Sequence, residues 1–323
     1  MRFGKSRGAD LDELESRLVW IVGGPRTGST WLLELLTYPL TPSAQSSSGA
    51  GMREQSSVRP FAIPVNEPYL GMHLAPIVSF GSGGVFTAAE ARNLLGPDPS
   101  YFFAEDYADV WRPQLRRLVL ERIGAQAQAA CREHGLDRPL VVVKEPNGSH
   151  AAPILASTLP RSRLLFLLRD GRDVLDSLAD AASPGGWLEA GSGAAGVTPA
   201  DSRIEFFRSS AGLWVHRTAA VQQAVAAHPP ELTMTVRYED LRLETGPVLR
   251  DIVSWLGVGV DETAVSEAVA ATSFEDYPPE AKGPGKPLRV ASPGHWRESM
   301  SQAEQETIAA VMGAKLAELG YEV

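Results

Sequence analysis

The fold of this chain is decided by the stretch Leu18-Val-Trp-Ile-Val-Gly-Gly-Pro-Arg-Thr-Gly-Ser-Thr-Trp31. It opens with five apolar residues, Leu18–Val22, and this run predicts a buried β-strand because turn-forming glycines and a proline stop it. From Thr30 onward, leucines at positions 32, 33, 35 and 36 predict a helix that packs on a sheet. A glycine-rich loop between a strand and a helix N-terminus aims backbone N–H groups at one point, so the stretch predicts an anion-binding loop.

Three further runs that predict strands lie at residues 140–143, 164–168 and 232–236. Each run leads into a cation: Lys144, Arg169 and Arg237 respectively. Continuous apolar strands that alternate with helical patterns are typical of a parallel sheet covered by helices on both faces. We therefore predict an α/β fold with a central parallel sheet flanked by helices, in a single domain at residues 18–323 after an N-terminal segment at residues 1–17.

Composition excludes several classes of protein. Thirty Lys and Arg against 39 Asp and Glu give a formal net charge of −9, which argues against a protein that coats nucleic acid. The single cysteine, Cys131, can form neither an internal disulfide nor a thiolate metal site. No apolar run approaches the roughly 18 residues of a membrane helix, and residues 1–17 lack the apolar core of a signal peptide. These features predict a soluble, cytoplasmic protein without nucleic-acid or membrane partners.

Two places in the chain are candidates for holding anions. The loop has the spacing of a nucleotide-binding P-loop, but Ser29 occupies the position of the lysine that clamps the β- and γ-phosphates, and the cation inside the loop is Arg26. The second place is Arg169, which leaves the end of a predicted strand, followed eight residues later by Ser177. From opposite sides, these two residues could hold one phosphate.

Taken together, the motifs resemble those of the cytosolic-type sulfotransferases that use 3′-phosphoadenosine 5′-phosphosulfate (PAPS). The resemblance runs from about residue 18 to the C-terminus, with five motifs in family order: Pro25-Arg-Thr-Gly-Ser-Thr-Trp31, Arg169 with Ser177, Tyr238-Glu-Asp-Leu241, Thr272-Ser-Phe274 and Gly294-His-Trp296. Two departures accompany them. The loop cation is arginine where many cytosolic members have lysine, and Val290 stands where a loop glycine is expected.

The resemblance implies a donor site, with adenosine 3′,5′-bisphosphate (PAP) as the product. It assigns the 5′-phosphosulfate to the loop residues Arg26, Thr27, Gly28, Ser29, Thr30 and Trp31, and the 3′-phosphate to Arg169 and Ser177. Trp31 and Phe274 would stack the adenine, Thr272 would line it and Tyr238 would contact its edge. Near the late Gly-x-Trp motif with Trp296, Arg289 would bind phosphate, with Arg297 as a substitute.

Sulfuryl transfer needs no metal and no electron carrier. By analogy with phosphoryl transfer, the protein positions the reactants and stabilises spread negative charge. The resemblance places Arg26 by the bridging oxygen and Lys144 by the sulfuryl group.

The general base is left open by the sequence. Pro146 stands where cytosolic members keep a histidine, two residues after Lys144. Glu67 lies in the region where other members carry a catalytic glutamate, and Pro68 is expected to hold it in extended backbone geometry. His150 is the alternative base, and His73 is a third candidate.

The sequence gives little information on the identity of the acceptor. The expected substrate is a hydroxyl of a small molecule, glycan or natural product, surrounded by loops at residues 41–57, 81–99 and 183–202. A homodimer is a possible assembly. Two other functions compete: a P-loop kinase of small molecules, and a non-catalytic nucleotide-binding relative.

Overall fold

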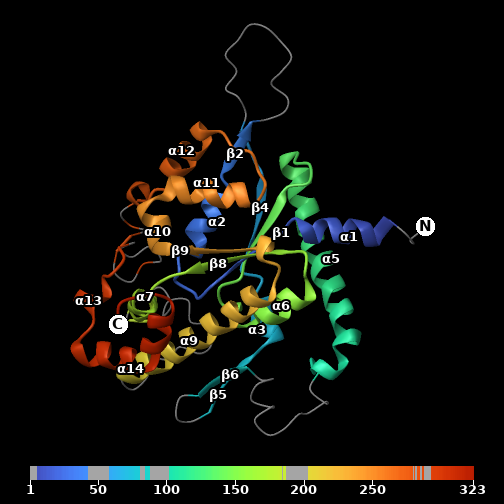
Figure 1. Ribbon diagram of the computed structural model, residues 1–323. Coiled ribbons are helices and arrows are strands. Elements are labelled where there is room, and N and C mark those ends of the chain that lie inside the picture. Colours follow the sequence, from blue (N-terminus) through green and yellow to red (C-terminus); the bar gives the residue numbers. More distant parts are fainter. Residues whose placement is uncertain are drawn as a thin grey trace.

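A five-stranded parallel sheet forms the centre of the molecule (Figure 1). The computed structural model describes residues 6–42, 58–80, 84–87, 102–183, 185–186, 203–278, 280, 282–283, 286 and 292–323. The strands lie in the order β4 (Ala62–Asn66), β7 (Leu140–Lys144), β1 (Leu18–Val22), β8 (Arg163–Leu168) and β9 (Thr233–Arg237). All four neighbouring pairs are parallel, so the predicted α/β fold with a central parallel sheet is confirmed.

Both faces of the sheet are buried under helices. Along β1, Leu18, Trp20 and Val22 enter one core, whereas Val19 and Ile21 enter the other. Strand side chains alternate between faces, so a strand covered on both sides is apolar throughout. This explains why the apolar run predicted β1 correctly.

The helices divide between the two cores, as Figure 1 shows. The first core is built with α1 (Ser6–Ser16), α3 (Leu70–Leu74), α5 (Ala108–His134), α6 (Ala152–Thr158), α7 (Gly171–Ala181), α9 (Arg203–Ala227), α13 (Trp296–Ser299) and α14 (Gln302–Glu318). The second is built with α2 (Ser29–Thr37), α10 (Tyr238–Leu243), α11 (Thr245–Trp255) and α12 (Glu262–Ala271). Short 3₁₀ turns connect them: η1 (Glu105–Tyr107), η2 (Ser149–Ala151), η3 (Pro230–Leu232) and η4 (Phe274–Asp276).

Strand β4 was not predicted. Its middle residue is Pro64, which breaks the apolar pattern and lacks a backbone N–H. Proline is tolerated at the edge of a sheet, and β4 lies at the edge, where it pairs with β7 from Ala62 opposite Leu140 to Asn66 opposite Lys144. The consequence is functional, because β4 delivers Glu67 to the carboxyl edge of the sheet.

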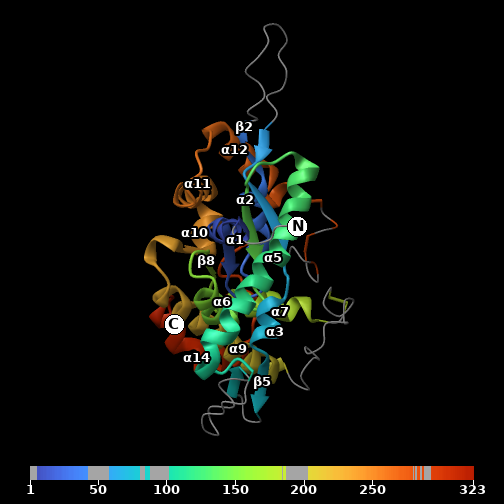
Figure 2. The same ribbon diagram turned by 90° about the vertical axis from the view of Figure 1, so that its right-hand side faces the viewer.

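Two antiparallel strand pairs extend from opposite ends of the molecule (Figure 2). They are β2 (Pro39–Pro42) with β3 (Val58–Pro60), and β5 (Ile77–Phe80) with β6 (Gly84–Thr87). The predicted acceptor loops at residues 41–57, 81–99 and 183–202 lie largely outside the described residues, and so does Arg289. Within the described part of the chain, none of the helices has both the length and the apolar character needed to span a bilayer.

The strand order places the loop after β1 at a topological switch point. From the central β1 the chain builds β4 and β7 on one side, then β8 and β9 on the other. Open parallel sheets bind ligands outside the carboxyl ends of their strands at such a point. The loops that follow β1, β4, β7 and β8 therefore converge on one region.

Packing of α2 against the sheet should dominate the stability of this region. Leu35 is fully buried in α2, whereas Leu243, at the end of α10, is 83% exposed. We expect Leu35→Ala to lower the free energy of unfolding by about 2–5 kcal/mol, because a buried cavity remains. Leu243→Ala should change it by less than about 0.5 kcal/mol. Urea unfolding of both variants checks this, and equal losses would contradict the assigned packing.

Candidate active site

The loop between β1 and α2 has a backbone that depends on glycine. Gly28 has φ +90°, and a Cβ there would lie 2.6 Å from Cδ2 of Tyr238. Arg26, with φ +67°, adopts a left-handed conformation that is unfavourable for a residue with a side chain. Its neighbour Thr27 stabilises the turn, since Oγ1 donates to the carbonyl of Gly24 at 2.8 Å. Strain of this kind persists only where the surroundings impose it, and it is typical of functional sites.

The residues of the two predicted anion sites lie in direct contact with each other. Nε of Arg26 donates to Oγ of Ser177 at 2.9 Å, and Nη1 of Arg169 donates to the carbonyl of Arg26, also at 2.9 Å. Nε of Arg169 is buried and has no hydrogen-bond partner. An unpaired buried donor is costly in a protein, so this group is well suited to bind an anionic ligand.

The ring of Tyr238 packs against the loop between β1 and α2. Its buried ring contacts Trp31 edge-on with 6.3 Å between centroids, and the guanidinium of Arg169 lies 4.3 Å from the ring centroid. Burial raises the pKa of the phenol. The ring also occupies the space that a side chain at position 28 would need. Tyr238 thus holds Gly28, Trp31 and Arg169 in their relative positions.

Lys144 and Glu67 form an ion pair beside the loop. Nζ of Lys144 lies 2.7 Å from Oε1 of Glu67 and donates to Oγ1 of Thr30 at 2.9 Å. The other carboxylate oxygen, Oε2, accepts hydrogen bonds from Tyr69 Oη at 2.9 Å and Asn147 Nδ2 at 3.1 Å. The structure therefore joins the candidate base, the strand-end cation and the start of α2.

The backbone of Glu67 differs from the expectation. Its φ is +46°, so the extended geometry predicted from Pro68 is wrong. The N–H of Glu67 donates to the carbonyl of Lys144 at 2.9 Å, which continues the β4–β7 pairing, while the side chain is held by Lys144. These contacts stabilise a conformation that the local sequence disfavours.

Opposing influences act on the pKa of Glu67. Partial burial raises it, but the hydrogen bond and charge of Lys144, together with hydrogen bonds from Tyr69 and Asn147, lower it below its ordinary value. Glu67 is therefore ionised at neutral pH and able to accept a proton.

His150 occupies a different environment from Glu67. It is 4% exposed in η2, and its Nε2 lies 2.6 Å from the carbonyl oxygen of Ala75. A ring nitrogen that donates to a backbone carbonyl is not the basic nitrogen of a catalytic imidazole. This placement favours a packing role for His150 over the role of general base. His73 is exposed in α3.

Glu145, which follows Lys144, is a buried acidic residue that was not predicted from the sequence. Its side chain is fully buried, and Oε2 accepts the N–H of Leu70 at 3.1 Å. Burial raises its pKa to about 7. Ser149 reinforces the same turn, because its Oγ lies 2.5 Å from the carbonyl oxygen of Gly23 and 2.9 Å from that of Glu145. No motif marks Glu145, and the only signal was an acidic residue directly after a buried strand.

The late Gly-x-Trp motif docks on the helix that carries Ser177. Asp173 of α7 accepts the backbone N–H groups of Gly294 at 2.7 Å and Trp296 at 3.3 Å. The Trp296 ring is buried, and the guanidinium groups of Arg172 and Arg297 lie 4.2 and 4.6 Å from its centroid. These contacts anchor the C-terminal segment beside the predicted 3′-phosphate site.

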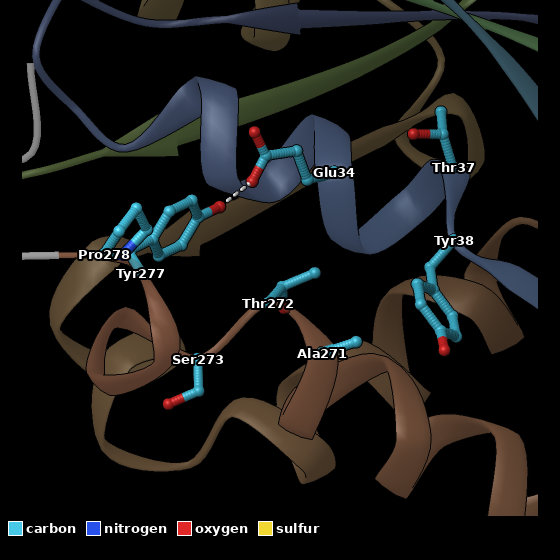
Figure 3. Close-up of a pocket in the computed structure, with 8 residues that line it drawn as sticks. All are labelled: Glu34, Thr37, Tyr38, Ala271, Thr272, Ser273, Tyr277 and Pro278. Atoms are coloured by element: carbon cyan, nitrogen blue, oxygen red, sulfur yellow. Dashed lines mark hydrogen bonds between the residues drawn. The ribbon is translucent and has the colours of Figure 1, made fainter. Parts of the chain in front are cut away.

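A cavity of about 450 Å³ opens between α2 and residues 271–278 (Figure 3). Glu34 projects from α2 and accepts a hydrogen bond from Tyr277 across it. Thr272 lines the cavity, and its Oγ1 donates to the carbonyl of Ala268 at 2.9 Å. Phe274, two residues further along the chain, has its ring 5.3 Å from Nζ of Lys282. The cavity thus separates the two segments that carry Trp31 and Phe274.

The raised pKa of Glu145 makes a prediction about stability. Between about pH 4.5 and 7 the folded chain keeps a proton on Glu145 that the unfolded chain releases, so this carboxyl destabilises the fold progressively as pH rises. Glu145→Gln removes the titration. Its free energy of unfolding relative to wild type should therefore increase by about 2–3 kcal/mol from pH 5 to pH 8. Urea unfolding at both pH values measures this. Glu298→Gln, at an exposed position, is the control, and a pH-independent difference for Glu145→Gln would contradict the prediction.

Comparisons with known proteins agree with this architecture. A search of curated protein sequences found no match. Among solved structures, mouse sulfotransferase SULT7A1 complexed with PAP is 11% identical, with 96% of this chain and 90% of that chain covered and a TM-score of 0.50. Sulfotransferase STF9 from Mycobacterium avium is 14% identical, with 98% and 81% covered and a TM-score of 0.51. At these identities the likeness concerns the fold. Residues 19–262 match the sulfotransferase family, and the chain belongs to that family, as its motifs predicted.

Proposed function

We propose that this protein transfers the sulfuryl group of PAPS to a hydroxyl of a small-molecule, glycan or natural-product acceptor. The observation that carries the proposal is the single site in which Arg26, Ser177 and Arg169 meet across the loop and α7, with the Lys144–Glu67 pair beside it. One end of this site is cationic and suits an anionic donor, and the other presents an ionised carboxylate that suits proton removal.

The residues present fit the donor at both of its ends. Arg169, with its unpaired Nε, and Ser177 would hold the 3′-phosphate. The strained loop with its N–H groups at the start of α2 would hold the 5′-phosphosulfate. The adenine would lie between Trp31 and Phe274, next to Thr272 and the cavity of Figure 3. The mouse structure of similar fold contains PAP, which supports this assignment.

In the transfer step, the acceptor oxygen forms a bond to sulfur while the bond from sulfur to the phosphate oxygen breaks, and PAP leaves. Glu67 accepts the proton of the acceptor hydroxyl. Arg26 and Lys144 stabilise the negative charge on the leaving phosphate and the sulfuryl oxygens. Lys144 can serve both reactants because its Nζ already bridges Glu67 and Thr30. Tyr69 and Asn147 keep the carboxylate aimed by occupying its second oxygen.

Ligand-dependent thermal stability tests the donor assignment. PAP should raise the thermal midpoint of the wild type, because a ligand that binds only the folded state stabilises it. ATP with Mg²⁺ should raise it less, and the opposite order would favour a small-molecule kinase.

Arg169→Ala should weaken PAP binding about 10- to 100-fold. It should leave adenosine 5′-phosphosulfate, which lacks the 3′-phosphate, nearly unchanged. Equal weakening of the two ligands in calorimetric titration would overturn the role of Arg169.

Glu67→Gln tests the base. The substitution keeps the size and the hydrogen bonds to Tyr69 and Asn147 but removes the basicity, so kcat should fall about 10²- to 10⁴-fold. The affinity for PAP should stay close to that of wild type, because the base faces the acceptor.

His150→Gln, assayed with the same acceptor, provides the comparison. It should retain turnover once its PAP binding shows that it is folded. Loss of turnover in folded His150→Gln with activity retained in Glu67→Gln would assign the base to the histidine instead.

A further inference from the structure

Arg217 of α9 is a largely buried cation without a counter-ion. Its Nη2 donates to the backbone carbonyl of Asn147 at 3.3 Å, while its Nε is buried and unpaired. None of the carboxylates in the described residues forms an ion pair with it. Burial lowers its pKa to about 10, so the guanidinium is still protonated at neutral pH.

Two other arginines of this protein, Arg172 and Arg116, are neutralised by carboxylates. Arg172 lies 2.8 Å from a carboxylate oxygen of Asp170, and Arg116 contacts both Asp12 and Glu15. Burial of a charge without a partner destabilises a fold, and residues retained despite such a penalty are concentrated at functional sites. Arg217 lacks such a carboxylate next to the proposed base, so we expect its partner to come from outside the chain.

The position of Arg217 identifies which reactant supplies that partner. Asn147 accepts the hydrogen bond of Arg217 with its carbonyl and donates from Nδ2 to Glu67 at 3.1 Å. One residue therefore separates the guanidinium from the proposed base. The donor phosphates have their own cations in Arg26 and Arg169, which contact each other across the loop. An anion at Arg217 would thus belong to the acceptor.

Arg169 provides an internal parallel. Its Nε is also buried and unpaired, its charge has no carboxylate in an ion pair among the described residues, and it is the residue to which the proposed function assigns a phosphate. Arg217 shows the same combination on the side of the site that carries Glu67.

We propose that Arg217 binds an oxyanion of the acceptor, a carboxylate or a phosphate, and so selects a hydroxylated acid over a neutral alcohol. The guanidinium fork matches two oxygens of such a group and would fix the acceptor relative to Glu67. This inference rests on the proposed function for the identity of the ligand as the acceptor, but the presence of an anion site can be tested without turnover.

The first experiment compares an acid with its amide. In the wild type, kcat/KM for 4-hydroxyphenylacetate should exceed that for 4-hydroxyphenylacetamide by about 10-fold or more, the effect of one charge-assisted contact. Arg217→Gln should abolish this preference by raising KM for the acid, with the amide unchanged. Arg208→Gln is the matched control, because Arg208 is an exposed arginine of the same helix, paired with Glu205. A preference retained in Arg217→Gln would overturn the proposal.

The second experiment needs no chemistry. Phenylacetate should raise the thermal midpoint of the wild type and of Arg208→Gln above the value with phenylacetamide at equal ionic strength. Arg217→Gln should lose this difference. Absence of the difference in wild type, or its persistence in Arg217→Gln, would contradict an anion site at this residue.

The third readout separates binding from a structural role. Without ligand, Arg217→Met should unfold at the same temperature as wild type or higher, since it removes an uncompensated buried charge. A lower midpoint together with lost PAP binding would show that Arg217 is structural. If PAP fails to bind the wild type while the phenylacetate effect depends on Arg217, the proposed function fails and the anion site stands.

Discussion

Parallel pairing of β1 with β7 and β8 is the constraint on which the site depends. In a parallel sheet all strands point the same way, so the residues that follow β1, β4, β7 and β8 leave from one edge. That geometry brings together the glycine-rich loop, a carboxylate and two cations from four separate parts of the chain. Side chains from both faces of β1 are packed in the two cores, and this packing holds the strand and its carboxyl end in place.

Neighbouring contacts give the two acidic side chains of the site opposite properties. Glu67 is partly exposed and paired with Lys144, so it stays ionised. Glu145 comes directly after Lys144 in sequence, yet burial dominates its environment and favours its protonated form. Glu67 is thereby suited to accept a proton, while Glu145 accepts a hydrogen bond from the N–H of Leu70 close to this proposed base.

Several features of the site lower the stability of the fold. Arg26 and Glu67 both have positive φ, which is unfavourable for residues with side chains. Arg169 and Arg217 carry buried nitrogen atoms without partners. These features lie together at the carboxyl edge, whereas the two cores below it are apolar and closely packed. Such a distribution is expected where a folded scaffold keeps groups ready for charged ligands.

The sequence by itself determined the anion loop, four of the five strands and the cations that follow them. These features are local, since a continuous apolar run and a glycine-rich turn have the same meaning wherever they occur. Tertiary structure alone decided the rest. Pro64 interrupts the apolar pattern, so β4 was not predicted, and the strand forms because it pairs with β7. Glu67 does not have the expected extended backbone geometry, because its contacts with Lys144 stabilise a positive φ. Nothing in the local pattern separated the buried His150 from a catalytic histidine, or Arg217 from an ordinary helix arginine. Burial and missing partners are produced by residues distant in sequence, so they emerge only when the chain is packed.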